Sequence, residues 1–516
     1  MSPVPAHTSS GGQRVVAVLS ASVLVATLVG GCSRVSELLG GGSSSPPSVG
    51  TPAGMEHLSE YYEQELDWVE CGPGECAELT VPLNYAEPGG QTIEISVLKS
   101  PARQQGNRLG ALVLNPGGPG GSGVDYASYA SFIVGPEVLE RYDIVGFDPR
   151  GVARSAPVSC VSEAEMDVQL GFLPLPEGVS DEELVDQFLD GCAANSGAIV
   201  GHVSTLDVVQ DMDILRANLG DEQLNFLGKS YGSYLGTVYA EQFTDRVGRF
   251  VLDGALPPDV TSEEITIGQA EGFERASRAW AQDCVDTAQC PLGSDVDSVM
   301  AGLGELIAGL DDDPVPVRGD ARISELTSAG AFWGVIQPMY DQGMWALLTD
   351  ALADVVEDGD GTELQGLANG YAERTPSGAY LGNLLQSNSV INCSDREPGT
   401  DPEGTLAAAR EAAPLWGELM ANLDDGLCDA WPYEIEGGTR TIAAAGSAPI
   451  VVIGTTRDPA TPYEWSQRLA DQLESGVLIS FDGDGHTAYM RSNSCVDQAV
   501  DDYLVKGTVP EDGLSC

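Results

Sequence analysis

The sequence predicts an α/β fold: a mainly parallel β-sheet flanked by helices, with a mostly helical cap inserted into it. Short apolar runs that are typical of buried strands alternate with segments of helical spacing before residue 257 and after residue 439. Between these positions the helical spacing continues and clear buried strands are missing. The chain of 516 residues is long enough for one large domain with an insertion, or for two domains.

The first part of the expected core covers residues 58–256. Residues 91–98 alternate polar and apolar side chains, as a half-buried strand does. Further short apolar runs predict strands at residues 111–114, 142–147, 224–227 and 249–252. Helical spacing appears at residues 206–219, which stop at a glycine, and at residues 234–243. This order of elements indicates strands joined by helical crossovers, and therefore a mainly parallel sheet.

The cap is expected over residues 257–439 and the rest of the core over residues 440–516. Within the cap, apolar side chains fall at helical spacing in residues 265–280, 299–310, 329–352 and 405–423. The C-terminal part returns to the sheet pattern, with strands at residues 449–454 and 477–481 and helices at residues 462–473 and 495–503.

The N-terminus is typical of a bacterial export signal. Arg14 precedes an apolar run at residues 15–29, which ends at Gly30-Gly31-Cys32. The run is too short to span a bilayer comfortably. A cysteine after small residues resembles a lipobox, so we expect residues 1–31 to be a signal peptide and Cys32 to be lipidated; plain secretion is the alternative. Residues 32–57 are then expected to be a flexible tether.

The cysteines also indicate export. Setting Cys32 aside leaves an even number, ten, of the 11 cysteines, which predicts disulfides in an exported chain. Close spacing favours two pairs, and sequential pairing of the others gives the full expected set: Cys71–Cys76, Cys160–Cys192, Cys284–Cys290, Cys393–Cys428 and Cys495–Cys516. There is no Cys-x-x-Cys motif and histidine is nearly absent, so we expect no metal site and no cofactor.

The strong negative charge limits the partners of this protein. The formal net charge is −54, from 78 acidic and 24 basic residues. Such a surface repels nucleic acid and anionic membranes, so we expect neither as a ligand. Membrane contact is expected only through the lipid anchor, on the outer face of the cell membrane, and the protein is expected to be a monomer.

Ser230 is the expected nucleophile. It lies in Gly228-Lys229-Ser230-Tyr231-Gly232, between an expected strand and an expected helix. A serine in that context occupies a sharp turn that exposes its hydroxyl at the carboxyl edge of the sheet, and the flanking glycines let the backbone pass close by. A glycine-rich turn with an incidental serine is the alternative interpretation, and the strand–turn–helix context favours the nucleophile.

A serine nucleophile needs a base and an acid, and the sequence offers few candidates. Of the four histidines, only His486 follows both Ser230 and the last expected strand. Asp458 lies just after the strand at residues 449–454, where its carboxylate can hold the imidazole. Asp482 and Asp484 are too close to His486 to come from a separate strand. Thr461 either bonds the Asp458 loop or caps the following helix.

Acyl transfer also requires hydrogen-bond donors for the oxyanion. The backbone N–H of Tyr231 is one candidate. The second is expected from the glycine-rich loop Asn115-Pro116-Gly117-Gly118-Pro119-Gly120-Gly121-Ser122-Gly123, where glycines let peptide N–H groups approach a substrate. We expect Gly118 to supply it. A phosphate-binding loop is the alternative, but the loop lacks Gly-Lys-Ser/Thr.

These motifs together resemble the prolyl and tripeptidyl aminopeptidases of the α/β-hydrolases, and most of all their exported actinobacterial branch with a TAP-like C-terminal region. The resemblance covers residues 58–516. It rests on residues 115–120, 147–155, 228–233, 253–255, 455–462 and 485–487. Ala153 stands where cytoplasmic prolyl aminopeptidases carry glycine, and Pro116 where they carry histidine. Both differences favour the tripeptidyl type.

The resemblance implies that the protein is a serine peptidase that releases short peptides, most of all tripeptides, from the N-termini of peptide substrates. Such an enzyme must bind a free ammonium, and Asp395 in the cap is the candidate carboxylate, because a disulfide at Cys393 would fix it. A surface ion pair with Arg396 is the alternative interpretation of Asp395. Two other functions remain: a cell-envelope esterase or lipase with the same triad, and a lipid-anchored binding protein with an inactive hydrolase fold.

Overall fold

The computed structural model describes residues 48–287, 290–420, 426–435 and 437–516 and contains a large central sheet. All of these belong to one compact unit. In spatial order, the ten strands of this sheet within the described residues are β1 (Val69–Cys71), β2 (Gly74–Pro82), β3 (Thr92–Ser100), β5 (Tyr142–Phe147), β4 (Gly110–Asn115), β6 (Leu224–Lys229), β7 (Val247–Asp253), β10 (Ile450–Arg457), β11 (Gly476–Asp484) and β12 (Leu514–Ser515). From β5 to β12 neighbouring strands are parallel, whereas β1, β2 and β3 form an antiparallel edge.

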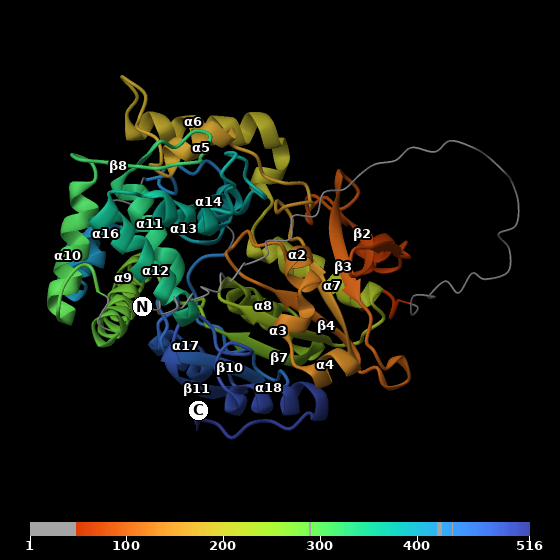
Figure 1. Ribbon diagram of the computed structural model, residues 1–516. Helices are drawn as coiled ribbons and strands as arrows, with labels where there is room; N and C mark the ends of the chain where they lie inside the picture. Colours follow the sequence, from red (N-terminus) through yellow and green to blue (C-terminus); the bar gives the residue numbers. More distant parts are fainter. Residues whose placement is uncertain (1–47, 288–289, 421–425, 436) are drawn as a thin grey trace, which may run out of the picture. The chain divides into compact units, whose positions relative to one another are not determined.

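Helices cover both faces of the sheet, as the sequence predicts. Side chains alternate along β4, so that Leu112 and Leu114 pack into one apolar cluster and Val113 into another. The first cluster includes side chains of α2 (Gly123–Ser128), α3 (Ala130–Ile133), α4 (Pro136–Arg141) and α18 (Ser494–Lys506). The second includes side chains of α7 (Thr205–Asn218), α8 (Tyr231–Gln242) and α17 (Tyr463–Gln472) (Figure 1). Burial on both faces explains why these strands are continuous apolar runs.

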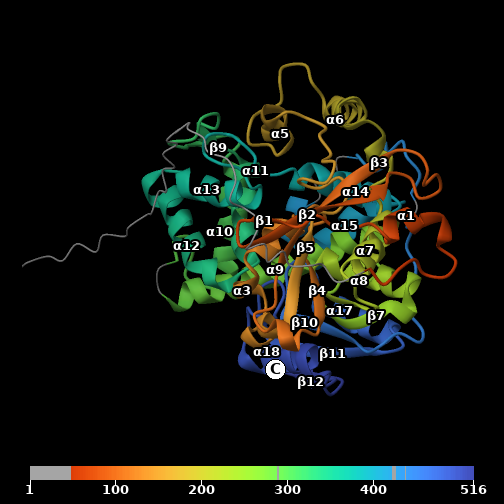
Figure 2. The ribbon, with the colours of Figure 1, turned by 90° about the vertical axis from the view of Figure 1, so that its right-hand side faces the viewer.

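The insertion between β7 and β10 is mostly helical. It contains α9 (Ser262–Asp286), α10 (Val296–Gly309), α11 (Ser328–Met339), α12 (Trp345–Ala353), α13 (Thr362–Tyr371), α14 (Leu384–Asp395), α15 (Pro402–Ala412), α16 (Trp416–Met420) and a small hairpin of β8 (Val315–Pro316) and β9 (Glu325–Leu326). Figures 1 and 2 show the helices α9 to α13 grouped together.

Two of the expected cap helices are each divided in the structure. The expected helix at residues 329–352 is interrupted between α11 and α12, just after Pro338 and around Gly343. The expected helix at residues 405–423 is interrupted between α15 and α16, where Pro414 cannot continue a helix. In both places the apolar spacing continues across the interruption, so spacing alone did not reveal it.

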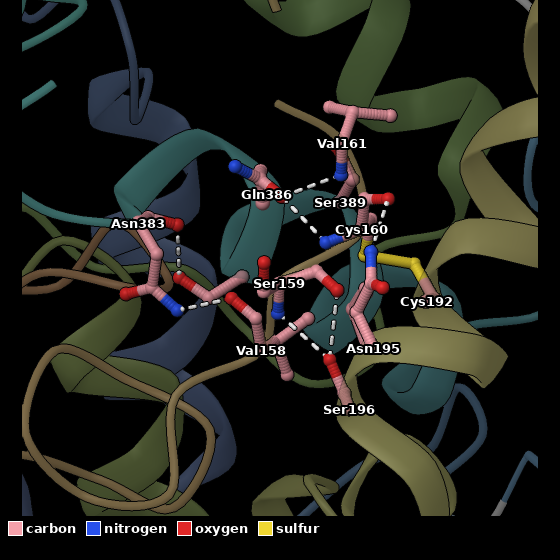
Figure 3. Close-up of a disulfide and its surroundings, with 12 residues drawn as sticks. Val158, Ser159, Cys160, Val161, Cys192, Asn195, Ser196, Asn383, Gln386 and Ser389 are labelled. Carbon is pink, nitrogen blue, oxygen red and sulfur yellow. Dashed lines mark hydrogen bonds between the residues drawn. A yellow bond between two sulfur atoms is a disulfide. The ribbon is translucent and has the colours of Figure 1, made fainter. Parts of the chain in front are cut away.

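A segment before the nucleophile packs against the cap. It contains α5 (Glu163–Gln169) and α6 (Asp181–Ser196), which lie next to α14 in both ribbon views. Gln386 of α14 accepts hydrogen bonds from the backbone N–H groups of Cys160 and Val161, and Asn383 donates to the carbonyl of Val158 (Figure 3). The segment lies within the expected core, residues 58–256, and its contacts with the cap join residues more than 200 positions apart, which no local pattern reveals.

The described residues contain five disulfides, with the pairing that the sequence predicts. They are Cys71–Cys76, Cys160–Cys192, Cys284–Cys290, Cys393–Cys428 and Cys495–Cys516. Cys160–Cys192 ties α6 to the segment that Gln386 holds (Figure 3). Five structural disulfides are typical of proteins that fold in an oxidising compartment.

The expected signal peptide and Cys32 lie outside the described residues. The end of the expected tether is described, and it is attached to the core: Ser48 Oγ donates to the carbonyl of Tyr62, and the N–H of Val49 donates to the carbonyl of Ala217. The short helices η1 (Glu56–Leu58) and α1 (Ser59–Tyr62) follow. Of the helices described, none is both long and apolar enough to cross a membrane.

Candidate active site

Ser230 lies on a sharp turn between β6 and α8. Its backbone is left-handed, with φ of 57°, which costs a residue with a side chain about 1–3 kcal/mol. The turn leaves no room for side chains at its flanks: a Cβ at Gly228 would lie 2.2 Å from the carbonyl oxygen of Gly232, and one at Gly232 would lie 2.9 Å from that of Asn115. The N–H of Ser230 donates to the carbonyl of Asp253 at 2.9 Å. The side chain is therefore held at the carboxyl edge of the sheet by the turn itself.

Asp458 and His486 are brought into contact. They follow β10 and β11, and His486 Nδ1 lies 2.9 and 3.0 Å from the two carboxylate oxygens of Asp458. Asp458 is fully buried. It also accepts hydrogen bonds from the backbone N–H groups of Ala460, Thr461 and Thr487. This arrangement favours the tautomer in which Nδ1 carries the proton and Nε2 is free to accept one.

The turn after β7 connects Ser230 to His486. Asp253 accepts the N–H of Ser230, and a Cβ on the next residue, Gly254, would lie 3.1 Å from His486 Cε1. His486 Nε2 is buried and has no hydrogen-bond partner within the described residues. A side chain at position 254 would displace the imidazole, so the glycine is required for this close approach. Catalytic hydrogen bonds are often long in a free enzyme and tighten when substrate binds.

The two expected oxyanion donors lie beside each other. A Cβ at Gly117 would lie 2.9 Å from Ser230 Cβ and 3.0 Å from the backbone nitrogen of Tyr231, so the glycine-rich loop rests on the nucleophile turn. The N–H of Gly117 is occupied by the side chain of Asn115. Tyr231 is the first residue of α8, where a helix leaves its N–H groups without intrahelical partners. The next N–H in the loop, that of Gly118, donates to no partner among the described residues.

Two cap residues, Tyr340 and Asn388, contact the histidine and the glycine-rich loop. The carbonyl of Tyr340, at the interruption between α11 and α12, accepts the backbone N–H of His486 at 3.0 Å. The two rings meet edge to face, with centroids 5.3 Å apart. Asn388 of α14 donates to the carbonyl of Pro119 in the glycine-rich loop at 3.0 Å. Neither residue is predictable from the sequence, since each acts across a contact between segments far apart in the chain.

Asp395 lies in the interior, away from solvent. It is fully buried, and its carboxylate accepts hydrogen bonds from the N–H and the hydroxyl of Thr205, both at 2.7 Å, and from the hydroxyl of Tyr231 at 3.3 Å. Burial raises the pKa of the Asp395 carboxyl. These partners satisfy the carboxylate within the protein, so we do not assign the ammonium site to Asp395.

The comparisons with known proteins agree with this geometry. The family model described as "alpha/beta hydrolase fold" matches residues 110–296, and that described as "TAP-like protein" matches residues 413–516. The chain is 36% identical to serine protease Hip1 of Mycobacterium tuberculosis over 98% of both chains. It belongs to the α/β-hydrolases with a TAP-like C-terminal region. It is also 36% identical to carboxylesterase B of M. tuberculosis, over 96% of this chain and 98% of that one. The tripeptidyl aminopeptidase of Streptomyces lividans is 30% identical, over 87% of this chain and 86% of its own length.

A cavity of about 780 Å³ borders the site of this α/β-hydrolase. Its walls come from the glycine-rich loop, from α2 and the residue after it, from the loop after β5 and from the cap: Pro116, Gly117, Gly121, Ser122, Asp125, Tyr126, Tyr129, Ala153, Arg154, Glu373, Tyr380, Leu381, Gly382, Asn383 and Leu384. A larger cavity of about 980 Å³ lies at the amino ends of the parallel strands and contains no expected site residue. Ligands of open α/β sheets bind at the carboxyl ends, which favours the first cavity as the substrate site.

Two carboxylates line the substrate cavity, and they differ in their partners. Asp125 forms an ion pair with Arg154 at 2.6 Å. Glu373 forms no salt bridge with any described residue. Its backbone is left-handed, with φ of 53°, which is rare for glutamate. Desolvation and the nearby Asp125 charge raise the pKa of Glu373. The cavity therefore contains one carboxylate that lacks a cationic partner, and the sequence pattern gave no signal for it.

Proposed function

We propose that this protein is an exported serine peptidase that releases short peptides from the N-termini of its substrates. The observation that carries the proposal is the placement of Ser230, Asp458 and His486 after β6, β10 and β11, at the carboxyl edge of one sheet and beside a cavity with an unpaired carboxylate. The names of two relatives, a serine protease and a tripeptidyl aminopeptidase, support peptide substrates. The five disulfides support export.

The proposed mechanism proceeds through an acyl-enzyme. His486 Nε2 accepts the proton of Ser230 as the hydroxyl attacks the scissile carbonyl, and the charge that develops on the carbonyl oxygen is stabilised by the N–H groups of Tyr231 and Gly118. His486 then gives the proton to the leaving amine. Water, activated by the same imidazole, releases the N-terminal fragment. Throughout, Asp458 orients the imidazole and stabilises its charged form.

In this proposal, Glu373 binds the N-terminal ammonium of the peptide substrate. A peptide whose carbonyl carbon reaches Ser230 would extend its N-terminal part into the cavity bordered by Gly117 and Glu373. The ammonium would supply the cation that Glu373 lacks, in a charge-assisted hydrogen bond. Release of tripeptides follows from the resemblance to the tripeptidyl aminopeptidases, and Cys32 remains the proposed site of lipid anchoring.

An esterase is the second candidate, because a relative named carboxylesterase is as similar as the serine protease. Tripeptide aminocoumarins and short acyl esters, each assayed with the purified protein and with Ser230→Ala, distinguish the two. We expect kcat/KM for at least one tripeptide amide to equal or exceed that for every ester. Rapid hydrolysis of esters without detectable release from any peptide would reject the peptidase and favour the esterase.

A further inference from the structure

Lys229 is a buried lysine directly before the proposed nucleophile. It is the last residue of β6 and only 6% exposed. Its ammonium donates a hydrogen bond of 2.8 Å to the carbonyl of Tyr489 and lies 3.6 Å from a carboxylate oxygen of Asp253. Burial lowers the pKa of Lys229, and the charge of Asp253 opposes that effect. Lysine is almost never buried unless it is paired, so this position requires an explanation.

Asp253 connects the nucleophile to the histidine loop. It ends β7, is fully buried, and is the strand neighbour of Lys229 in the β6–β7 register. Its backbone carbonyl accepts the N–H of Ser230, whereas its carboxylate accepts the N–H groups of Ala488 and Tyr489 at 2.9 and 3.0 Å. One residue therefore contacts both Ser230 and the turn that follows His486.

The turn at residues 487–490 has an unfavourable backbone. Thr487 and Met490 are left-handed, with φ of 68° and 62°, a conformation that persists only where the surroundings enforce it. Two N–H groups and one carbonyl of this turn bond to Lys229 and Asp253. The ion pair is therefore a main support of the turn, and His486 immediately precedes that turn.

We propose that Lys229 and Asp253 are positioning residues: they fix the 487–490 turn on the two strands that hold Ser230, and so hold the imidazole where it can take the serine proton. This inference rests on the proposed catalytic roles of Ser230 and His486. Neither positioning residue needs to touch the substrate. A displacement of about 1 Å in such a geometry lowers a rate by about 100-fold.

The test compares Lys229→Met with a matched control, Lys99→Met. Lys99 lies in β3, is 8% exposed and forms an ion pair with Glu75 at 3.0 Å. After thermal melting confirms that each variant is folded, kcat, KM and the rate at which a fluorophosphonate labels Ser230 are measured. We expect Lys229→Met to lower kcat and the labelling rate by about 100-fold, with KM within about twofold. Lys99→Met should leave all three within about twofold of the wild type.

Two outcomes would overturn the inference. The first is that kcat and the labelling rate of Lys229→Met stay within about threefold of the wild type. The second is that kcat and the labelling rate fall equally in Lys229→Met and Lys99→Met, which would indicate general destabilisation. If Lys229→Met does not fold, Asp253→Asn is measured instead. The asparagine side chain has the size of aspartate and keeps one acceptor oxygen but no charge, so kcat should fall by about tenfold. An unchanged kcat in this variant would also overturn the inference. Failure of the probe to label the wild type would instead reject the catalytic roles themselves, so the two failures are distinguishable.

Discussion

Replacing His486 with alanine is expected to lower kcat/KM for a tripeptide amide by about four orders of magnitude or more. The hydroxyl of Ser230 is a weak nucleophile near neutral pH, and His486, whose Nδ1 lies 2.9 Å from Asp458, is the proposed base. Asp458→Asn should cause a loss of similar size, because the amide can hold the imidazole in the wrong tautomer. Steady-state kinetics at saturating and limiting substrate measure both losses.

His57→Ala is the matched control for this prediction. His57 is exposed and lies in η1, where it contacts none of the site residues. We expect its kinetics to stay within about twofold of the wild type. A loss below about tenfold in His486→Ala would show that another group takes the serine proton, and the assignment of the base would then be abandoned.

Acetylating the substrate's amino group is expected to lower kcat/KM by about 100-fold. In the proposed complex the substrate ammonium pairs with Glu373, and acetylation removes that charge while the carboxylate is still covered by the substrate. A tripeptide aminocoumarin and its N-acetyl form are compared at pH 7. Glu373→Gln should lower kcat/KM for the free amine by about tenfold and leave the acetylated peptide nearly unchanged. The effect of Glu373 is smaller because this side chain is exposed to solvent in the free protein.

Glu363→Gln controls for the loss of a negative charge from the cap. Glu363 is exposed on α13 and does not line the substrate cavity. Its kinetics should match the wild type for both peptides. Equal rates for the free and the acetylated peptide would contradict the exopeptidase proposal and favour an endopeptidase or an esterase, whereas an unchanged Glu373→Gln would move the ammonium site to another residue.

The central strands could be predicted because each is specified locally. The run at residues 142–147 has the same bounds as β5, and the runs that predict β4, β6, β7, β10 and β11 differ from them by a few residues. The short parallel strand β12 was not predicted. A strand buried on both faces must be continuously apolar, so its position is visible in a short window of sequence. The placement of Ser230, Asp458 and His486 at one edge follows from that sheet, because the carboxyl ends of parallel strands meet there.

The cap could be predicted in part: the expected helices at residues 265–280 and 299–310 correspond to α9 and α10, whereas other cap elements were not visible in the sequence. Helix α14 is rich in polar residues such as Ser387 and Asn388, which contact the glycine-rich loop, so it lacks the apolar spacing on which the prediction depends. Tyr340 bonds His486 at a helix interruption that apolar spacing did not reveal. The buried environment of Asp395 and the unpaired state of Glu373 depend on partners remote in sequence, which no local pattern specifies.

The central claim, that Ser230 is an activated nucleophile, is tested most directly by labelling with a fluorophosphonate probe and locating the adduct by peptide mass spectrometry. The probe reacts with a serine only where a base has activated it. The account predicts one adduct for each molecule, on the peptide that contains Ser230, and none in Ser230→Ala. An unlabelled wild-type protein, or labelling that persists in Ser230→Ala, would contradict it.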